Sequence, residues 1–137
     1  MPDEHPLSEE LLEHVARYGV GRIGRHIFLC ADQAEPKCAP RAQTLAAWEY
    51  LKTRLAELGL TSGARVTYRT KANCLRMCAQ GPIAVVYPEG GWYHSANADV
   101  LERIIQEHLI RGEPVREYAF AVNPLSPEPD APGVTLR

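Results

Sequence analysis

Apolar residues recur at helical spacing in three segments of the chain. Ser8 can cap the first segment and Gly19 can end it, which predicts a short helix between them. The second segment, residues 40–59, opens on a proline and ends at a glycine, as helices commonly do. The third segment, residues 97–112, also places its apolar residues on one side of a helix. The apolar positions of the second and third segments are Leu45, Trp48, Leu51, Leu55, Leu58, Val100, Leu101, Ile104, Ile105, His108 and Leu109.

Four shorter runs have the pattern of β-strands. Residues 26–30 are a short apolar run, and residues 64–70 place Val66 and Tyr68 on one face. Residues 83–87 are more apolar and precede a Pro-Glu-Gly-Gly turn, so residues 91–94 should return as the partner strand of a hairpin. The order strand-helix-strand-strand-strand-helix predicts an α/β fold, a small thioredoxin-like sheet with flanking helices.

The two ends of the chain lie outside this order. We expect residues 1–24 to form a helical appendage with a glycine-rich joint, residues 25–112 the folded domain, and residues 113–137 an irregular proline-rich tail. Residues 19–24 match the G-x-G-x-x-G pattern. That pattern binds dinucleotides only between a preceding strand and a following helix, whereas here the order is reversed, so no nucleotide site is expected.

The composition is that of one folded domain. The chain has 137 residues, 45% of them hydrophobic and 23% charged, within the roughly 100–200 residues of a single domain. A chain of this size folds without a metal or disulfide, so a metal site would point to function. Because no apolar run could cross a bilayer and the first residues lack a secretory signal pattern, we expect a cytoplasmic protein with no membrane partner.

Charge is nearly balanced over the whole chain but unevenly distributed. Residues 37–76 contain eight Lys and Arg against two Glu, while the net charge of the protein is -2. Solvated helix and strand faces explain such a segment, and the alternative is that it surrounds an anionic group. Since the basic residues are not interleaved with aromatic ones, a nucleic-acid partner is not expected.

The four cysteines carry the candidate chemistry. Seven residues separate Cys30 from Cys38, and three separate Cys74 from Cys78. If the first two strands are neighbours, their carboxyl ends bring Cys30 and Cys74 to one edge, and a helical turn at 74–78 would place both its sulfurs on one face. No C-x-x-C dithiol is present. In a reducing compartment this spacing predicts a four-cysteine metal site, without deciding between zinc and an iron–sulfur cluster.

The order of these motifs resembles that of the thioredoxin-like 2Fe-2S ferredoxins. It combines the cysteine spacing with Tyr-Pro-Glu-Gly at 87–90 and Trp-Tyr at 92–93, over residues 25–112. The first cysteine loop is shorter than in many members of that family. The resemblance implies one 2Fe-2S cluster, one-electron transfer and often a homodimer. The ligands that it implies are Cys30, Cys38, Cys74 and Cys78.

The function implied by the resemblance is that of an electron carrier between a reductase and an acceptor enzyme, with no catalytic residues of its own. Two alternatives stay open: a cluster-bearing subunit of an NADH-linked oxidoreductase complex, and a zinc-stabilised interaction domain. The short first helix favours the free carrier over the complex subunit. Four basic residues are candidates to raise the reduction potential and to meet an acidic partner, namely Lys37, Arg41, Lys71 and Arg76.

Overall fold

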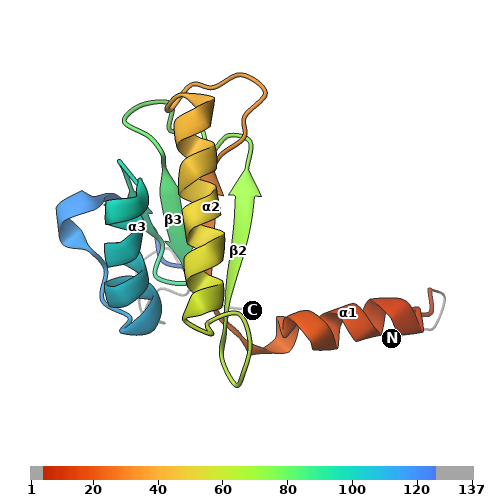
Figure 1. Cartoon of the computed structure of the whole chain (residues 1–137). Helices are drawn as coiled ribbons and strands as arrows, with labels where there is room; N and C mark the ends of the chain where they lie inside the picture. The colour runs from red at the N-terminus through yellow and green to blue at the C-terminus, as the bar shows by residue number, and fades with distance from the viewer. Residues whose placement is uncertain (1–4, 126–137) are drawn as a thin grey trace, which may run out of the picture.

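One five-stranded sheet organises the protein, and the computed structural model describes residues 5–125 (Figure 1). The strand order is β2-β1-β3-β4-β5, in which β1 and β2 are parallel and every other pair is antiparallel. The strands are β1 Ile23–Cys30, β2 Val66–Ala72, β3 Ala84–Tyr87, β4 Gly91–Tyr93 and β5 Ala119–Val122. The helices are α1 Glu9–Tyr18, α2 Arg41–Glu57 and α3 Ala98–Arg103, with a π-helix η2 Ile104–Ile110 continuing α3, and short 3-10 helices η1 Val20–Arg22 and η3 Arg116–Tyr118.

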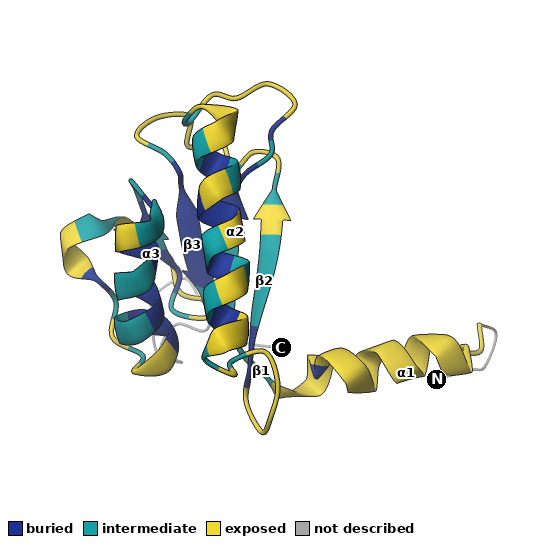
Figure 2. Ribbon diagram, in the orientation of Figure 1, coloured by how far each residue is buried: buried dark blue, intermediate teal, exposed yellow. Residues whose placement is uncertain are grey.

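Helices α2 and α3 cover one face of the sheet, where the core lies (Figure 2). Ile27 and Leu29 of β1 point into this core, and Leu51 and Leu55 of α2 meet them with fully buried side chains. Burial of apolar surface stabilises the fold by roughly 25 cal/mol per Å². Within residues 5–125, no helix has the length and apolar character needed to cross a membrane.

The predicted order of elements is confirmed, with strand and helix ends shifted by a few residues. The first helix begins as expected, because the Ser8 hydroxyl accepts a 3.1 Å hydrogen bond from the Leu11 N–H. It ends at Gly19, whose φ of +66° is a left-handed conformation that favours glycine. Asn97 precedes α3, and every predicted apolar position of the 97–112 helix is buried.

The prediction of an irregular tail is wrong for residues 116–122, which form η3 and β5. Strand β5 pairs with β4, with Ala121 opposite Trp92. The Trp92 and Phe120 rings lie 6.4 Å apart in an edge-to-face contact. Residues 119–122 form a strand because they pair with the free edge of β4. The run has only four residues and lies between prolines, so its sequence pattern alone does not predict a strand. The rest of the predicted tail, residues 126–137, lies outside the described residues.

A partly buried chain of polar side chains ties the 87–90 turn to the last helix. His108 is fully buried and bonds the Tyr93 hydroxyl at 2.7 Å and the Glu89 carboxylate at 2.9 Å. Glu89 also accepts two hydrogen bonds from the Arg25 guanidinium, at 3.0 and 3.1 Å. Burial lowers the pKa of His108 from its ordinary value. His108, which the sequence places on the apolar side of the last helix, is thus a buried and hydrogen-bonded histidine.

Candidate four-cysteine site

The four cysteines line one cavity of about 230 Å³ beyond the carboxyl ends of β1 and β2. Cys30 is the last residue of β1 and lies opposite Ala72, the last residue of β2. Cys74 follows β2 by two residues, so the parallel pairing of the two strands brings both cysteines to the same edge. The expectation that adjacent strands deliver Cys30 and Cys74 to one place is therefore correct.

The sulfurs form two pairs. Cys30 Sγ and Cys38 Sγ are 2.8 Å apart, and Cys74 and Cys78 lie close enough for each thiol to shift the pKa of the other. The helical turn considered for residues 74–78 does not form; both cysteines lie in an irregular loop. Cys30 is buried, whereas Cys74 and Cys78 are exposed. No group of three or more His, Cys, Asp or Glu side chains suited to a metal ion is found within residues 5–125.

Three N–H groups point at sulfur atoms of the site. The Ile83 N–H donates to Cys30 Sγ at 3.1 Å, and the Arg76 N–H donates to Cys74 Sγ at 3.3 Å. The side-chain amide of Gln33 donates to Cys38 Sγ at 3.2 Å. Hydrogen bonds to sulfur stabilise negative charge there, so these donors favour thiolates.

The thiols differ in acidity because their surroundings differ. Burial raises the pKa of Cys30 to about 12, and its hydrogen bond with Cys38 adds to the effect. The Arg76 N–H bond lowers the pKa of Cys74, helped by the positive charges of Lys37 and Arg76. Partial loss of hydration beside Cys74 raises the pKa of the exposed Cys78. Cys74 is thus the thiol that the chain best prepares for deprotonation.

Of the four basic candidates from the sequence, two are engaged with one carboxylate. Asp32 accepts from Arg41 at 2.6 Å and from Lys71 at 3.1 Å, and these bonds lower its pKa. In the described part of the chain Lys37 and Arg76 form no salt bridge. Their charges therefore act on the cysteine cavity more directly than those of Arg41 and Lys71.

The loops around the cavity contain unusual backbone geometry. Asp32, Arg76 and Gln80 have φ values of +55°, +71° and +51°, a region that residues with side chains seldom adopt. Gly81 packs against Cys38, and a Cβ there would come within 2.7 Å of the Cys38 sulfur. Such strain is kept where surrounding contacts hold it, commonly at functional sites.

Two contributors to the site escaped the sequence interpretation. Gln33 is buried and bonds Cys38, and Ile83 offers its backbone N–H to Cys30. A lone glutamine in a polar loop has no pattern that separates it from surface residues. Its position three residues after Cys30 is the one signal that could have drawn attention to it. A backbone donor leaves no trace in the side-chain sequence at all.

Comparison with known proteins identifies relatives. The chain is 34% identical over 92 residues to a 2Fe-2S ferredoxin of Clostridium pasteurianum, covering 66% of this chain and 90% of the relative. It is 29% identical over 102 residues to a 2Fe-2S ferredoxin of Aquifex aeolicus, with 71% and 89% covered. A solved thioredoxin-like [2Fe-2S] ferredoxin from Aquifex aeolicus superposes with a TM-score of 0.60 at 25% identity, over 72% of this chain and 92% of that one. No protein-family profile matches the chain.

The fold and the cysteine cavity define a small thioredoxin-like protein with a four-thiol site. The chain belongs to the thioredoxin-like 2Fe-2S ferredoxin family. The resemblance in the order of its motifs and the predicted thioredoxin-like fold are thereby confirmed.

Proposed function

We propose that this protein is a one-electron carrier whose single 2Fe-2S cluster is held by Cys30, Cys38, Cys74 and Cys78. The observation that carries the proposal is that all four thiols line one cavity in two pairs. Four cysteine thiolates hold the two-iron cluster of ferredoxins, and the four lining thiols supply that donor chemistry. The family relationship to ferredoxins supports the same function and favours a carrier over an enzyme.

When bound, the cluster supplies reversible one-electron chemistry. The chain's own contribution is to hold the thiolates and to balance their charge. Ile83, Arg76 and Gln33 direct N–H donors at three of the four sulfurs. Hydrogen bonds to sulfur and nearby positive charge both stabilise added negative charge, and so raise the reduction potential.

The test of this function uses protein purified without oxygen. We expect visible charge-transfer absorption, about two irons and two sulfides per chain, and a spin-half EPR signal after dithionite reduction. A colourless protein that contains zinc would contradict electron transfer and would favour the zinc-stabilised interaction domain.

Arg76→Glu should lower the reduction potential of the protein. Arg76 is exposed, its N–H contacts Cys74, and its positive charge acts on that thiol. Reversing the charge disfavours the more negative reduced state, by an amount on the order of tens of millivolts. Protein-film voltammetry or a spectroscopic redox titration measures the change.

The matched control is Arg111→Glu, an equal charge reversal at another exposed arginine, beyond the end of η2. We expect its potential to stay close to that of the unaltered protein. Equal potentials for Arg76→Glu and Arg111→Glu would show that Arg76 does not tune the site.

The partners that we propose are a reductase and an acceptor enzyme with acidic docking surfaces. Lys37 and Arg76 support this choice, because they present positive charge beside the cysteine cavity. The ferredoxin relatives favour a free carrier over a subunit of an NADH-linked complex. Stable co-purification with a flavin subunit would reverse that preference.

A homodimer in the cytoplasm completes the proposal. The dimer rests on the family resemblance, and we expect residues 25–112 to take part in the contact. For the cytoplasmic location the support is the expectation that a reducing compartment keeps cysteines available as metal ligands.

A further inference from the structure

The loop after β1 contains a buried glutamine with a buried hydroxyl behind it. Gln33 is 3% exposed, and Thr44, in the first turn of α2, is fully buried. The Gln33 amide nitrogen donates to Cys38 Sγ at 3.2 Å, and the Thr44 hydroxyl donates to Gln33 Oε1 at 3.1 Å. Both ends of the amide thus have the partners that buried polar groups require. The three side chains form a line that runs from α2 to a sulfur of the four-cysteine site.

The charge of the sulfur determines which end of the Gln33 amide faces it. A thiolate accepts hydrogen bonds but has no proton to donate, so it bonds the NH2 end of the amide and not the carbonyl end. The Thr44 hydroxyl has one proton and two acceptors at 3.1 Å, Gln33 Oε1 and the Arg41 carbonyl oxygen. Because the α-helix pairs that carbonyl with the backbone N–H four residues later, Gln33 Oε1 is the acceptor that depends on Thr44.

The backbone on both sides of Gln33 is attached to other elements. The Asp32 N–H donates to Thr44 Oγ1 at 3.4 Å, and the Asp32 carboxylate is bonded to side chains of α2 and β2. The Ala34 N–H donates to Asn73 Oδ1 at 3.0 Å. In Figure 1 this loop lies at the end of the molecule where α2 begins and β2 ends. The structure therefore holds Gln33 in place from both directions along the chain.

We propose that Thr44 is a positioning residue of the four-cysteine site, and that it acts on Cys38 through Gln33. The Thr44 hydroxyl keeps the carbonyl end of the amide turned toward α2, so the NH2 end stays directed at the sulfur. A donor that is already oriented stabilises added negative charge without having to rotate first. The pair thereby raises the reduction potential of the protein. The inference rests on the proposed function, because it assigns part of that function to two residues outside the four cysteines.

The test measures the reduction potentials of Gln33→Leu and Thr44→Val in the cluster-loaded protein. The two variants keep the approximate size of each side chain and remove the N–H donor and the orienting hydroxyl respectively. At one fixed applied potential, we expect the ratio of reduced to oxidised protein to fall roughly tenfold in each, a shift of about 59 mV for one electron. Thr44→Ser retains the hydroxyl and should keep the potential of the unaltered protein. Because Thr44 acts only through Gln33, the double variant should match Gln33→Leu alone.

Gln43→Leu and Thr53→Val are the matched controls. Gln43 also lies in the first turn of α2, but its side-chain amide donates to Asn97 Oδ1 at 2.8 Å and not to a sulfur. Thr53 lies on the exposed side of the same helix. The potentials of both controls should stay equal to that of the unaltered protein.

Pulsed EPR of the reduced protein tests the contact itself. With the glutamine side chains labelled with ¹⁵N, the unaltered protein should show a nitrogen coupling to the spin-half centre. Gln33→Leu should lose this coupling, Gln43→Leu should keep it, and Thr44→Val should weaken it. A residue that only supported the fold of the loop would give no such coupling.

Three results would overturn the inference. The first is an unchanged or raised potential in Gln33→Leu, or an equal shift in Gln43→Leu. The second is the same potential in Thr44→Val and Thr44→Ser, which would exclude the hydroxyl. The third is loss of iron in Gln33→Leu or Thr44→Val, which would assign the pair to loop structure instead of potential. All three leave the electron transfer of the unaltered protein in place, whereas a colourless, zinc-containing protein would contradict the proposed function and the inference together.

Discussion

Cys30→Ala should abolish cluster binding, reducing the iron content from about two atoms per chain to nearly none. Cys30 is buried at the end of β1, beside Cys38 and the Ile83 N–H. Its loss removes one of the four thiols that line the cavity, and the other lining side chains offer no fifth sulfhydryl. Iron and sulfide analysis, with the visible spectrum of protein purified without oxygen, measures the effect. Cys38→Ala and Cys74→Ala should lose their iron in the same way as Cys30→Ala.

Met77→Ala is the control for these variants. Met77 lies between Cys74 and Cys78, lines the same cavity and is 40% exposed. The substitution Met77→Ala changes the loop without removing any of the four thiols, so the iron content of this variant should match that of the unaltered protein. Full iron content in Cys38→Ala would show that Cys38 is not a ligand. Cys38 is the cysteine that follows the short first loop.

Leu51→Ala should lower the free energy of unfolding by about 3 kcal/mol. Leu51 is fully buried in the middle of α2, where it belongs to the core formed with β1, β3 and α3. Truncation loses buried methyl groups and leaves a cavity that the neighbouring side chains fill only in part. Urea unfolding followed by circular dichroism should show a midpoint lower by about 1–3 M, given the usual dependence of stability on urea.

Leu125→Ala provides the comparison, since the same atoms are removed from a side chain that is 63% exposed. The midpoint of this variant should stay within about 0.5 M of that of the unaltered protein. Equal shifts in Leu51→Ala and Leu125→Ala would contradict the assignment of α2 as the helix that closes the core.

The elements of the fold could be predicted where the local pattern is strong. The helical spacing of Trp48, Leu51 and Leu55 in α2 and the Pro-Glu-Gly-Gly turn at the start of β4 needed no tertiary information, because period and turn chemistry are properties of consecutive residues. β5 could not be predicted in the same way. Its four residues become a strand through pairing with β4, a contact between segments that the sequence alone does not relate.

The same distinction, between local pattern and tertiary contact, separates the features of the site that could be predicted from those that could not. Residue type and spacing predicted that the four cysteines form a metal site, and the order of motifs indicated the family. The sequence could not assign the Gln33 and Ile83 donors or the engagement of Arg41 and Lys71 by Asp32, because each depends on loops that meet only in the folded chain.

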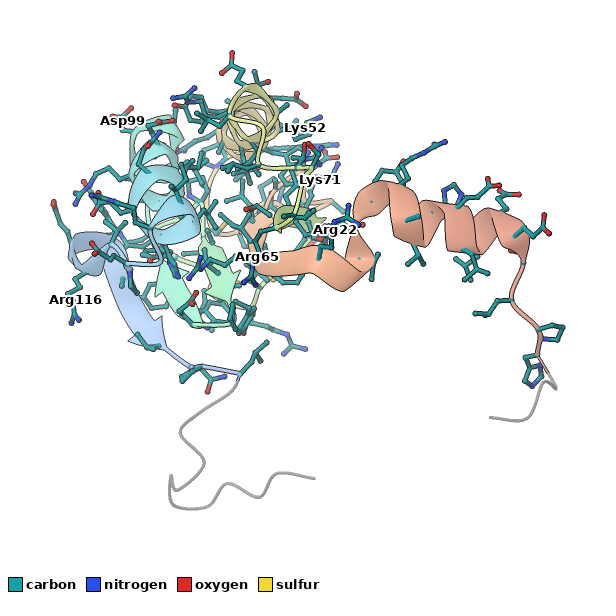
Figure 3. All side chains as sticks on the ribbon, turned by 90° about the horizontal axis from the view of Figure 1, so that it is seen from below. Arg22, Lys52, Arg65, Lys71, Asp99 and Arg116 are labelled. Atoms are coloured by element: carbon teal, nitrogen blue, oxygen red, sulfur yellow. The ribbon has the colours of Figure 1, made fainter. Side chains whose placement is uncertain are left out.

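By itself, the sequence determined the class of fold, the presence of four thiols and the basic segment at residues 37–76, since these follow from residue identity and periodicity. Only the tertiary structure decided that α1 points away from the core and that no helix within residues 5–125 covers the other face of the sheet (Figures 1 and 3). An amphipathic pattern predicts that a helix has an apolar side. Which surface covers that side depends on the joint at Gly19 and on contacts distant in the chain.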